Sequence, residues 1–317
     1  MSSKIAVVVP AFNEEECIDE LCRRLGQVFD AETAYDWEAV LVENGSEDST
    51  WQKLRDINQI DPRFKVLRLS RNFRMDGGLT AGLDYVDADA CVLMTADLQD
   101  PPELIPELVR KWEAGFENIY GVVTQRQGTG PIRSLNSRLF YLLASRLTDG
   151  RIPKNASDFR LLDRKVYESV RGIHERNRFV RGLVAWVGFK SVGVPFERPP
   201  RFAGESKAYS LKVFELALKG IFAHSYVPLR LISLFGLVMS VFAVIGLGSA
   251  AVLWITQGVP FGGFGTIVAL ILLVLGVLSF MIGVVSEYVG MIYEEVKGRP
   301  NYVVSEVIGL GPDSTTA

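Results

Sequence analysis

Residues 95–102 read Thr95-Ala96-Asp97-Leu98-Gln99-Asp100-Pro101-Pro102 and follow the apolar run of residues 90–94. The apolar run is short, partly β-branched and bounded by polar residues, which indicates a buried strand. The two prolines cannot continue a sheet, so the strand ends there and the chain turns. Asp97, Gln99 and Asp100 are therefore expected at the carboxyl end of a central strand, where open α/β sheets place their ligands.

Carboxylates at such a strand end have two interpretations. The chain holds only two histidines, so a metal at Asp97 would be an oxygen-ligated cation, Mg²⁺ or Mn²⁺, rather than zinc. The alternative is that the acids only cap the helix that begins near Pro102.

The composition separates the chain into two parts. It has 317 residues, of which 48% are hydrophobic, and a net charge of −3, but the apolar excess lies after residue 228. The slight acidity argues against a nucleic-acid partner. The three cysteines form no C-x-x-C pair and are expected to be reduced packing residues of a cytosolic domain. The run after Lys4 is too short for the apolar core of a signal peptide.

The first part repeats one pattern. Apolar runs at residues 5–9, 37–42, 65–69 and 90–94 are each followed by a polar loop and a helix-like segment. This alternation is typical of a doubly wound α/β sheet, whose loops converge on one edge. No G-x-G-x-x-G motif follows the first run, so a dinucleotide site is not supported.

Residues 208–227 place apolar residues at helical spacing and charged residues on the other face. Such a helix either packs in a soluble core or lies in the headgroup layer of a membrane. Its position directly before two long apolar segments favours the membrane surface.

Two uncharged segments, residues 231–255 and 266–285, are each long enough to cross a bilayer. Arg230, Lys297 and Arg299 flank their outer ends, while the turn between them has no Lys or Arg. The positive-inside rule then places the turn outside and both termini, with the first part of the chain, in the cytoplasm. The expected location is the plasma membrane of a bacterium, as an integral protein with two spans. The alternative is a buried hairpin. Small-residue packing would support a homo-oligomer through Gly236, Gly246 and Gly276.

Motifs along the whole chain resemble one known family. Five motifs resemble those of glycosyltransferase family 2: Val9-Pro10-Ala11-Phe12-Asn13-Glu14, Asn44-Gly45-Ser46-x-Asp48, Ala96-Asp97-Leu98-Gln99-Asp100-Pro101-Pro102, Asp158-Phe159-Arg160 and Arg178-Phe179-x-Arg181-Gly182. Two further motifs resemble the polyprenyl-phosphate branch of this family, which includes enzymes similar to dolichol-phosphate mannose synthase. They are Arg201-x-x-Gly204-Glu205-Ser206-Lys207 and Glu287-Tyr288-x-Gly290 with Tyr293-Glu294-Glu295-x-Lys297-Gly298-Arg299-Pro300. The likeness runs from about residue 4 to residue 304.

The resemblance implies an α/β catalytic domain of the GT-A (Rossmann-like) fold, with a mostly parallel sheet, at residues 1–207. An amphipathic juxtamembrane helix at 208–227, a two-helix transmembrane hairpin at 228–292 and a cytoplasmic tail at 293–317 would follow. The implied reaction is inverting transfer of one sugar from a nucleotide sugar to a polyprenyl phosphate such as undecaprenyl phosphate. UDP-glucose is the favoured donor by family frequency; N-acetylhexosamine, galactose and GDP-mannose are alternatives.

The resemblance also implies roles for matching residues. Asp97 would hold the divalent metal, Gln99 would face the sugar, and Asp158 matches the residue usually assigned as the base. The nucleotide would be lined by Pro10, Ala11, Asn13, Glu14, Asn44, Asp48, Thr95 and Ala96. The phosphates of donor or acceptor would be held by Arg126, Arg178, Arg181, Arg201, Ser206 and Lys207.

This sequence departs from the family pattern at three places. Glu43-Asn44 stands where the family often has Asp-Asp or Asn-Asp, and Thr95 stands where it has the first Asp of Asp-Ala-Asp. Both changes remove a carboxylate at the nucleotide end, so they bear on nucleotide identity and metal affinity. Ala208 separates Lys207 from Tyr209, which are usually adjacent.

The expected chemistry leaves the role of Asp158 open. A metal at Asp97 with Arg201 and Lys207 would stabilise the charge that develops on the leaving diphosphate. A phosphate monoester has its second pKa near ~6, so the acceptor is largely dianionic at neutral pH. Asp158 would therefore either abstract a proton or orient the acceptor, a cation or the metal. The alternative for the basic residues is a solvated loop or surface salt bridges.

Two other functions compete with this one. A processive polysaccharide synthase would carry a Q-x-x-R-W motif and further membrane helices, and neither is found in the sequence. A non-catalytic membrane scaffold with a degenerate site is favoured by Asn44 and Thr95, but opposed by Asp97, Asp158 and the retained basic residues.

Overall fold

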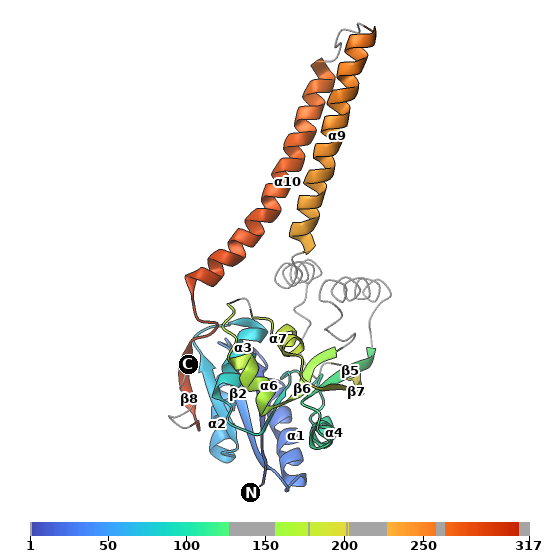
Figure 1. Ribbon diagram of the computed structural model, residues 1–317. Coiled ribbons are helices and arrows are strands. Elements are labelled where there is room, and N and C mark those ends of the chain that lie inside the picture. Colours follow the sequence, from blue (N-terminus) through green and yellow to red (C-terminus); the bar gives the residue numbers. More distant parts are fainter. Residues whose placement is uncertain are drawn as a thin grey trace. The chain divides into compact units, whose positions relative to one another are not determined.

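The computed structural model describes residues 2–126, 156–176, 178–200, 202, 227–257 and 264–310. Contacts divide the chain into two units, residues 1–215 with 298–317, and residues 216–297. The first unit contains an α/β domain, and the second contains two long helices, α9 and α10 (Figure 1).

The α/β domain is built on one eight-stranded sheet in the order β7-β5-β6-β4-β1-β2-β3-β8. Its strands are β1 Lys4–Ala11, β2 Asp36–Glu43, β3 Phe64–Leu69, β4 Ala90–Leu93, β5 Asn118–Arg126, β6 Ala156–Asp163, β7 Ser191–Arg198 and β8 Val304–Ile308. The described helices of this unit are α1 Ile18–Ala31, α2 Thr50–Ile60, α3 Arg74–Tyr85, the 3₁₀ turn η1 Pro102–Leu104, α4 Ile105–Glu113, α6 Arg164–Arg171 and α7 Val180–Val187.

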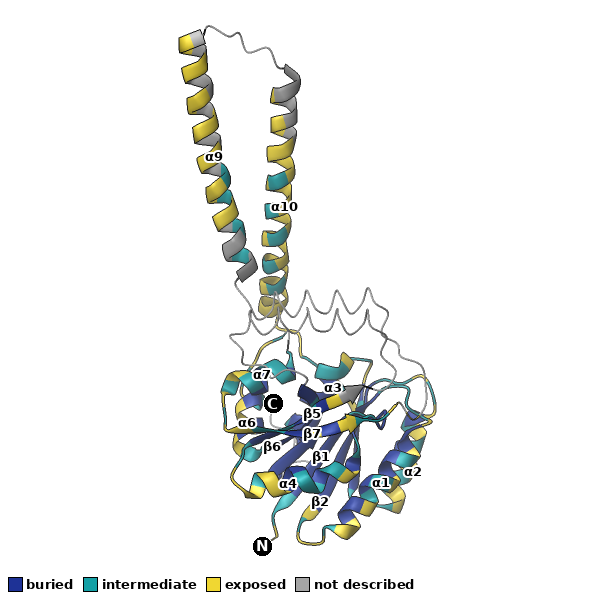
Figure 2. Cartoon of the chain, turned by 90° about the vertical axis from the view of Figure 1, so that its right-hand side faces the viewer, coloured by how far each residue is buried: buried dark blue, intermediate teal, exposed yellow. Residues whose placement is uncertain are grey.

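Two hydrophobic layers cover the sheet because its central strands are apolar on both faces. Ile5, Val7 and Val9 of β1 pack with buried residues of α1, α2 and α4, whereas Ala6 and Val8 of the same strand pack with α3, α6 and α7. Figure 2 shows the buried strands between these helices. The result is the three-layer α/β sandwich that the alternating sequence pattern predicts.

The strand directions place one end of β6 beside the ends of β1, β2 and β4. β1 pairs in parallel with β2 and with β4, while β6 runs antiparallel to β4. The carboxyl ends of the central strands therefore share an edge with the amino end of β6, which carries Asp158. This edge, called the loop edge below, brings the acidic motifs of the first hundred residues to the same side as Asp158.

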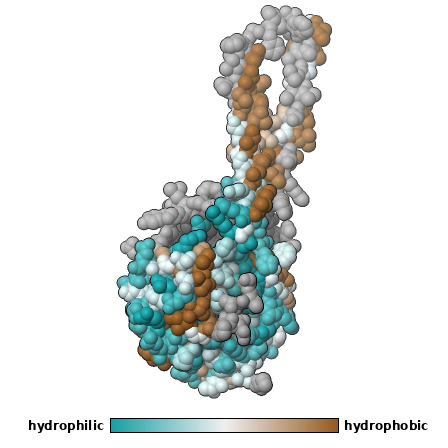
Figure 3. Space-filling view, turned by 90° about the vertical axis from the view of Figure 1, so that its left-hand side faces the viewer, coloured by the Kyte–Doolittle hydropathy of each residue, from teal (hydrophilic) through white to brown (hydrophobic). Residues whose placement is uncertain are grey.

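The second unit is a pair of contacting helices, α9 Val227–Gln257 and α10 Phe264–Lys297. Much of their described surface is apolar (Figure 3). Side chains such as Leu237, Phe242 and Phe280 are exposed. Within the described residues, one segment, Leu273–Lys297, has the length and composition needed to cross a membrane.

The C-terminal segment differs from the expected tail. The boundary predicted at residue 293 falls inside α10, and Val304–Ile308 form β8, which pairs antiparallel with β3. The Tyr302 hydroxyl also donates to Asp84 Oδ2 of α3 over 2.9 Å. The chain thus returns to the sheet and covers the β3 edge, which the short, mixed sequence of β8 did not signal. The amphipathic helix predicted at 208–227 lies, apart from residue 227, outside the described residues.

Candidate active site

The loops after β1 and β2 are joined by hydrogen bonds between side chains and backbone. The Asn13 N–H donates to Ser46 Oγ over 3.0 Å, and Asn13 Oδ1 accepts from the Glu47 N–H over 2.9 Å. Asp48 accepts from the N–H groups of Glu15 and Thr50. Burial alone would raise the pKa of Asp48, but the hydrogen bonds from Thr50 and Glu15 outweigh it and hold the pKa below its usual value. These predicted nucleotide residues therefore share one preorganised wall.

Glu43 and Asn44, the first departure from the family pattern, are buried and fully used by the fold. The Asn44 amide donates to Arg74 O over 2.8 Å and accepts from the Phe73 N–H over 2.9 Å. Glu43 accepts from the Ser46 N–H and pairs with Arg68 over 3.2 Å. Asn44 thus anchors the start of α3, and its predicted contact with a nucleotide stays a prediction. Pro10 and Ala11, also predicted to line the nucleotide, are buried at the end of β1.

Thr95, the second departure, bridges two carboxylates. Its Oγ1 lies 2.7 Å from Asp97 Oδ1 and 2.8 Å from Asp100 Oδ2. Asp97 Oδ1 also accepts from the Gln99 N–H over 3.2 Å. Leu98 has a positive φ of 58°, so the backbone turns sharply between the strand and the prolines. The hydroxyl therefore takes the position of the missing acid and orients Asp97 instead of supplying a second charge.

Asp100 is fully buried and joins β4 to β6 and β7. Its Oδ1 accepts from Arg198 over 3.2 Å and from Ser157 Oγ over 3.4 Å. Burial raises the pKa of the Asp100 carboxyl, and Arg198 and Thr95 offset part of that rise. Asp100 therefore has a structural role, because it has no exposed surface that could contact a substrate.

Asp158, the predicted base, forms a two-point ion pair with Arg181 at the start of α7. Arg181 Nε donates to Asp158 Oδ1 over 2.8 Å, and a second guanidinium nitrogen donates to Oδ2. Burial would raise the pKa of Asp158, but Arg181, with smaller contributions from Arg160 and Arg198, outweighs it and lowers the pKa. A carboxylate so stabilised in its charged form is a weak proton acceptor.

Asp76 is a residue that the sequence analysis did not single out. Its Oδ1 accepts from the N–H of Val180, the first residue of α7, over 3.0 Å. Burial, with the nearby Asp158 charge, raises the pKa of Asp76 to about 6, although the Val180 hydrogen bond opposes the rise. Asp76 caps α7 from a neighbouring helix and so fixes the backbone that carries Arg181. A lone acid in the first turn of α3 gave no signal of this contact.

The predicted phosphate-binding residues divide into three groups. Arg181 lies at the loop edge, paired with Asp158. Arg178 instead donates to the backbone oxygen of Val170, and burial lowers its pKa, so the structure gives it a packing role. The side chain of Arg126 and residues Arg201, Ser206 and Lys207 lie outside the described part of the chain.

The residues at the loop edge fit a cation that is held mainly by its substrate. Among the described residues, no group of three or more His, Cys, Asp or Glu side chains is arranged to hold a metal ion. Mg²⁺ typically takes one or two carboxylates and fills its remaining positions with phosphate oxygens and water. Asp97, oriented by Thr95 and by the Gln99 N–H, is suited to supply such a carboxylate.

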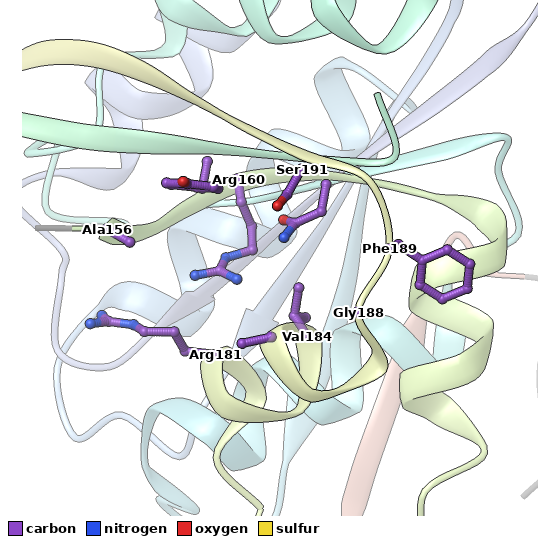
Figure 4. A pocket seen from close by; sticks show the side chains of 10 residues that line it. Ala156, Arg160, Arg181, Val184, Gly188, Phe189 and Ser191 are labelled. Carbon is purple, nitrogen blue, oxygen red and sulfur yellow. The ribbon is translucent and has the colours of Figure 1, made fainter. Parts of the chain in front are cut away.

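A pocket extends from the loop edge along the sheet, beneath α7 (Figure 4). Arg160 and Arg181 point into it in Figure 4. The side chain of Arg160 is 4% exposed and donates to Ser157 O over 2.9 Å. Burial lowers the pKa of this guanidinium to about 10, and the Asp158 charge offsets part of that effect.

Comparison with known proteins agrees with this geometry. The glycosyl transferase family 2 profile matches residues 6–171. A prophage bactoprenol glucosyl transferase homolog of Escherichia coli K12 is 36% identical over 305 residues, covering 96% of this chain and 99% of that protein. The chain belongs to glycosyl transferase family 2.

Other relatives of this glycosyltransferase match over nearly the same length. The bactoprenol glucosyl transferase of Shigella phage SfX is 36% identical over 301 residues, covering 95% of this chain and 98% of that protein. An uncharacterized glycosyltransferase of Synechocystis is 39% identical over 310 residues, covering 98% of this chain and 97% of that protein.

One solved structure supports the GT-A fold. It is that of glucosyl-3-phosphoglycerate synthase from Mycobacterium tuberculosis, in complex with Mn²⁺, UDP and phosphoglyceric acid. Its TM-score is 0.51 at 17% identity, covering 69% of this chain and 76% of that one. The α/β domain of this glycosyltransferase therefore has the expected fold.

Proposed function

We propose that this glycosyltransferase transfers glucose from UDP-glucose to a polyprenyl phosphate, with inversion, and makes a lipid-linked sugar donor. The observation that carries the proposal is the full-length similarity to proteins named bactoprenol glucosyl transferase. The loop edge supports it, because it brings the loops that carry Asn13, Asp48 and Asp97 to the same side of the sheet as Asp158. UDP as the nucleotide is part of the proposal and follows family frequency.

The donor would bind at the carboxyl ends of β1, β2 and β4. The wall formed by Asn13, Ser46 and Asp48 would face the nucleoside, and Asp97 would hold Mg²⁺ or Mn²⁺. When bound, the metal supplies a positive charge to the diphosphate as the sugar bond breaks. Mn²⁺ in the crystals of the M. tuberculosis synthase makes a divalent cation plausible here.

The acceptor would reach the site as a phosphate that already carries its negative charge. Its second pKa near ~6 leaves it largely dianionic at neutral pH, so it needs no strong base. The pair of Asp158 and Arg181 then serves best as a rigid positioning group, with Arg181 presenting positive charge toward an anionic acceptor.

The membrane location completes the proposal. α9 and α10 would form two spans, with the α/β domain and both termini in the cytoplasm of a bacterium. Leu273–Lys297 of α10 has the composition required for a span, and the positive-inside rule gives the orientation. A tether of this kind raises the local concentration of a lipid acceptor near the enzyme. Assembly into a homo-oligomer through the helices belongs to the same proposal.

A donor panel tests the proposed reaction. Full-length protein in detergent is incubated with labelled UDP-glucose, UDP-N-acetylglucosamine, UDP-galactose or GDP-mannose, together with Mg²⁺ and undecaprenyl phosphate. We expect label in a lipid monophosphate, strongest with UDP-glucose. A polymeric product would favour a polysaccharide synthase, and no turnover with any donor would favour a scaffold.

A further inference from the structure

The pocket beneath α7 contains a buried positive charge that the transfer reaction does not use. It is lined along its length by residues of β5, β6, β7 and α7, and its volume is about 180 Å³. In the strand register Tyr120 of β5 lies opposite Arg160 of β6, and Asn118 lies opposite Ser191 of β7. Paired residues in neighbouring strands point to the same face, so these side chains form one floor.

Within the part of the chain that the structure describes, no carboxylate is paired with Arg160. The nearest acid in electrostatic terms is Asp158, but both oxygens of Asp158 are bonded to Arg181. Among the described residues, Arg160 forms no salt bridge, and Ser157 O is its hydrogen-bond acceptor. A buried, uncompensated guanidinium is destabilising unless an anion reaches it.

Asn118 provides a second, independent feature of the same pocket. The residue is 7% exposed, and its Oδ1 is buried without a hydrogen-bond partner among the described residues. Buried polar atoms are almost always paired with protein, water or ligand. An unpaired acceptor beside a buried arginine suits a ligand that has anionic oxygens and one proton to donate.

We propose that this pocket binds a hydrogen phosphate group between Arg160 and Asn118, as free phosphate or as the singly protonated form of a phosphomonoester. The guanidinium would bond two phosphate oxygens, and the P–OH would donate to Asn118 Oδ1. The pocket has room for one phosphate group but not for a nucleoside diphosphate sugar. The site is thus separate from the donor wall at β1, β2 and β4, and its occupancy does not depend on the proposed transfer.

The test measures binding, without turnover. Full-length protein in detergent is titrated with sodium phosphate against sodium chloride at equal ionic strength, without metal or donor, and Tm is recorded. We expect a saturable rise in Tm with phosphate, and a much smaller rise with sulfate, which has no proton to donate at neutral pH. A short-chain prenyl monophosphate forms a second arm, measured at about pH 6, where about half of the ester still carries its proton. Much tighter binding of the prenyl ester would identify a lipid headgroup as the source of the phosphate.

Three variants locate the binding. Asn118→Asp supplies an internal carboxylate beside Arg160 and should abolish the phosphate response while the protein stays folded. Arg160→Met should also abolish it. Arg164→Gln, which removes an arginine that pairs with Asp87 at the surface, should keep the full response.

Several results would overturn the proposal. These are the absence of a phosphate response in the wild-type protein, an equal response to sulfate, or a full response in Asn118→Asp. If UDP with Mn²⁺ displaced the phosphate, the phosphate would be bound at the donor site, and that result would also contradict the proposal. Because no outcome involves sugar transfer, failure here leaves the proposed reaction standing, and the reverse also holds.

Discussion

The acids that follow β4 and the acid at the start of β6 lie on the same edge of the sheet, but they are held by different groups. Asp97 accepts hydrogen bonds from a hydroxyl and a backbone N–H, which orient its carboxylate. Asp158 is held by the guanidinium of Arg181 at two points. Neutral donors prepare a carboxylate for a cation, whereas an arginine already supplies the countercharge. The comparison is the basis for the proposal that Asp97 binds the metal and that Asp158 has a positioning role.

Removing the charge of Asp97 should have the largest effect. Asp97→Asn keeps the size of the side chain, but the lost metal contact should lower turnover by about a thousandfold, since cation stabilisation of a leaving group is worth several kcal/mol. Label incorporation into lipid across an Mg²⁺ titration measures it. Asp36→Asn, at an exposed position at the start of β2, is the matched control. Wild-type turnover by Asp97→Asn would erase the contrast between the two acids.

The role of Asp158 can be separated from base catalysis by a pH profile. Asp158→Asn should lower turnover by about a hundredfold through misplacement of Arg181, yet the acid limb of the rate near pH ~6 should persist, because the acceptor phosphate causes it. The double variant with Arg181→Gln should be about as slow as Asp158→Asn alone, since the pair acts as a unit. Loss of the acid limb in Asp158→Asn would instead identify Asp158 as the base.

The hydroxyl of Thr95 should contribute less. Thr95→Val keeps the shape but removes the group between Asp97 and Asp100, so the two carboxylates lose a shared partner. We expect the Mg²⁺ concentration that gives half-maximal turnover to rise about tenfold. The free energy of unfolding should fall by about 1–3 kcal/mol. Denaturant melts and Mg²⁺ titrations measure these changes, with the exposed Thr33→Val as control. Unchanged metal dependence would show that Thr95 does not orient Asp97.

The smallest expected effect concerns Asp76 and the way in which the free energy of unfolding depends on pH. Its pKa of about 6 in the folded protein lies above the unfolded value near 4. The folded state therefore binds more protons between these values, and the free energy of unfolding falls as pH rises from about 4 to about 6.

Asp76→Asn keeps the acceptor for Val180 but removes this titration. As the pH rises from about 4 to about 6, the free energy of unfolding of Asp76→Asn should increase by about 1–2 kcal/mol relative to that of the wild-type protein. Denaturant melts at several pH values measure the gain, and Asp76→Ala, which also lacks the acceptor, should be destabilised at every pH. Parallel pH curves for the wild type and Asp76→Asn would contradict the raised pKa.

The sequence was sufficient to predict the central sheet, because long apolar runs followed by polar loops have few other solutions. Motifs of fixed spacing also named Asp97 and Asp158 as site residues, and their roles stay predictions. Asn44 shows the limit of this reasoning. Its contact with a nucleotide stays a prediction, whereas the bonds of its amide to the backbone of Phe73 and Arg74 could not be predicted from the motif.

The remaining features depend on contacts between distant residues. Arg160 lies inside a recognised motif, yet its burial without a countercharge follows from how β5 and α7 enclose it. β8 is a five-residue strand that forms because β3 leaves an open edge, and a short polar-apolar segment alone does not indicate pairing. These features appear only after the chain has folded.

The most direct test of the central claim is to locate the cation. Crystals of the full-length protein with UDP and Mn²⁺, measured at an anomalous wavelength, would show the ion as a single strong peak. We expect that peak at coordination distance, about 2.1–2.3 Å, from a carboxylate oxygen of Asp97, with UDP phosphate oxygens as further ligands. A peak beside Asp158 and away from Asp97 would contradict the assignment of the two acids.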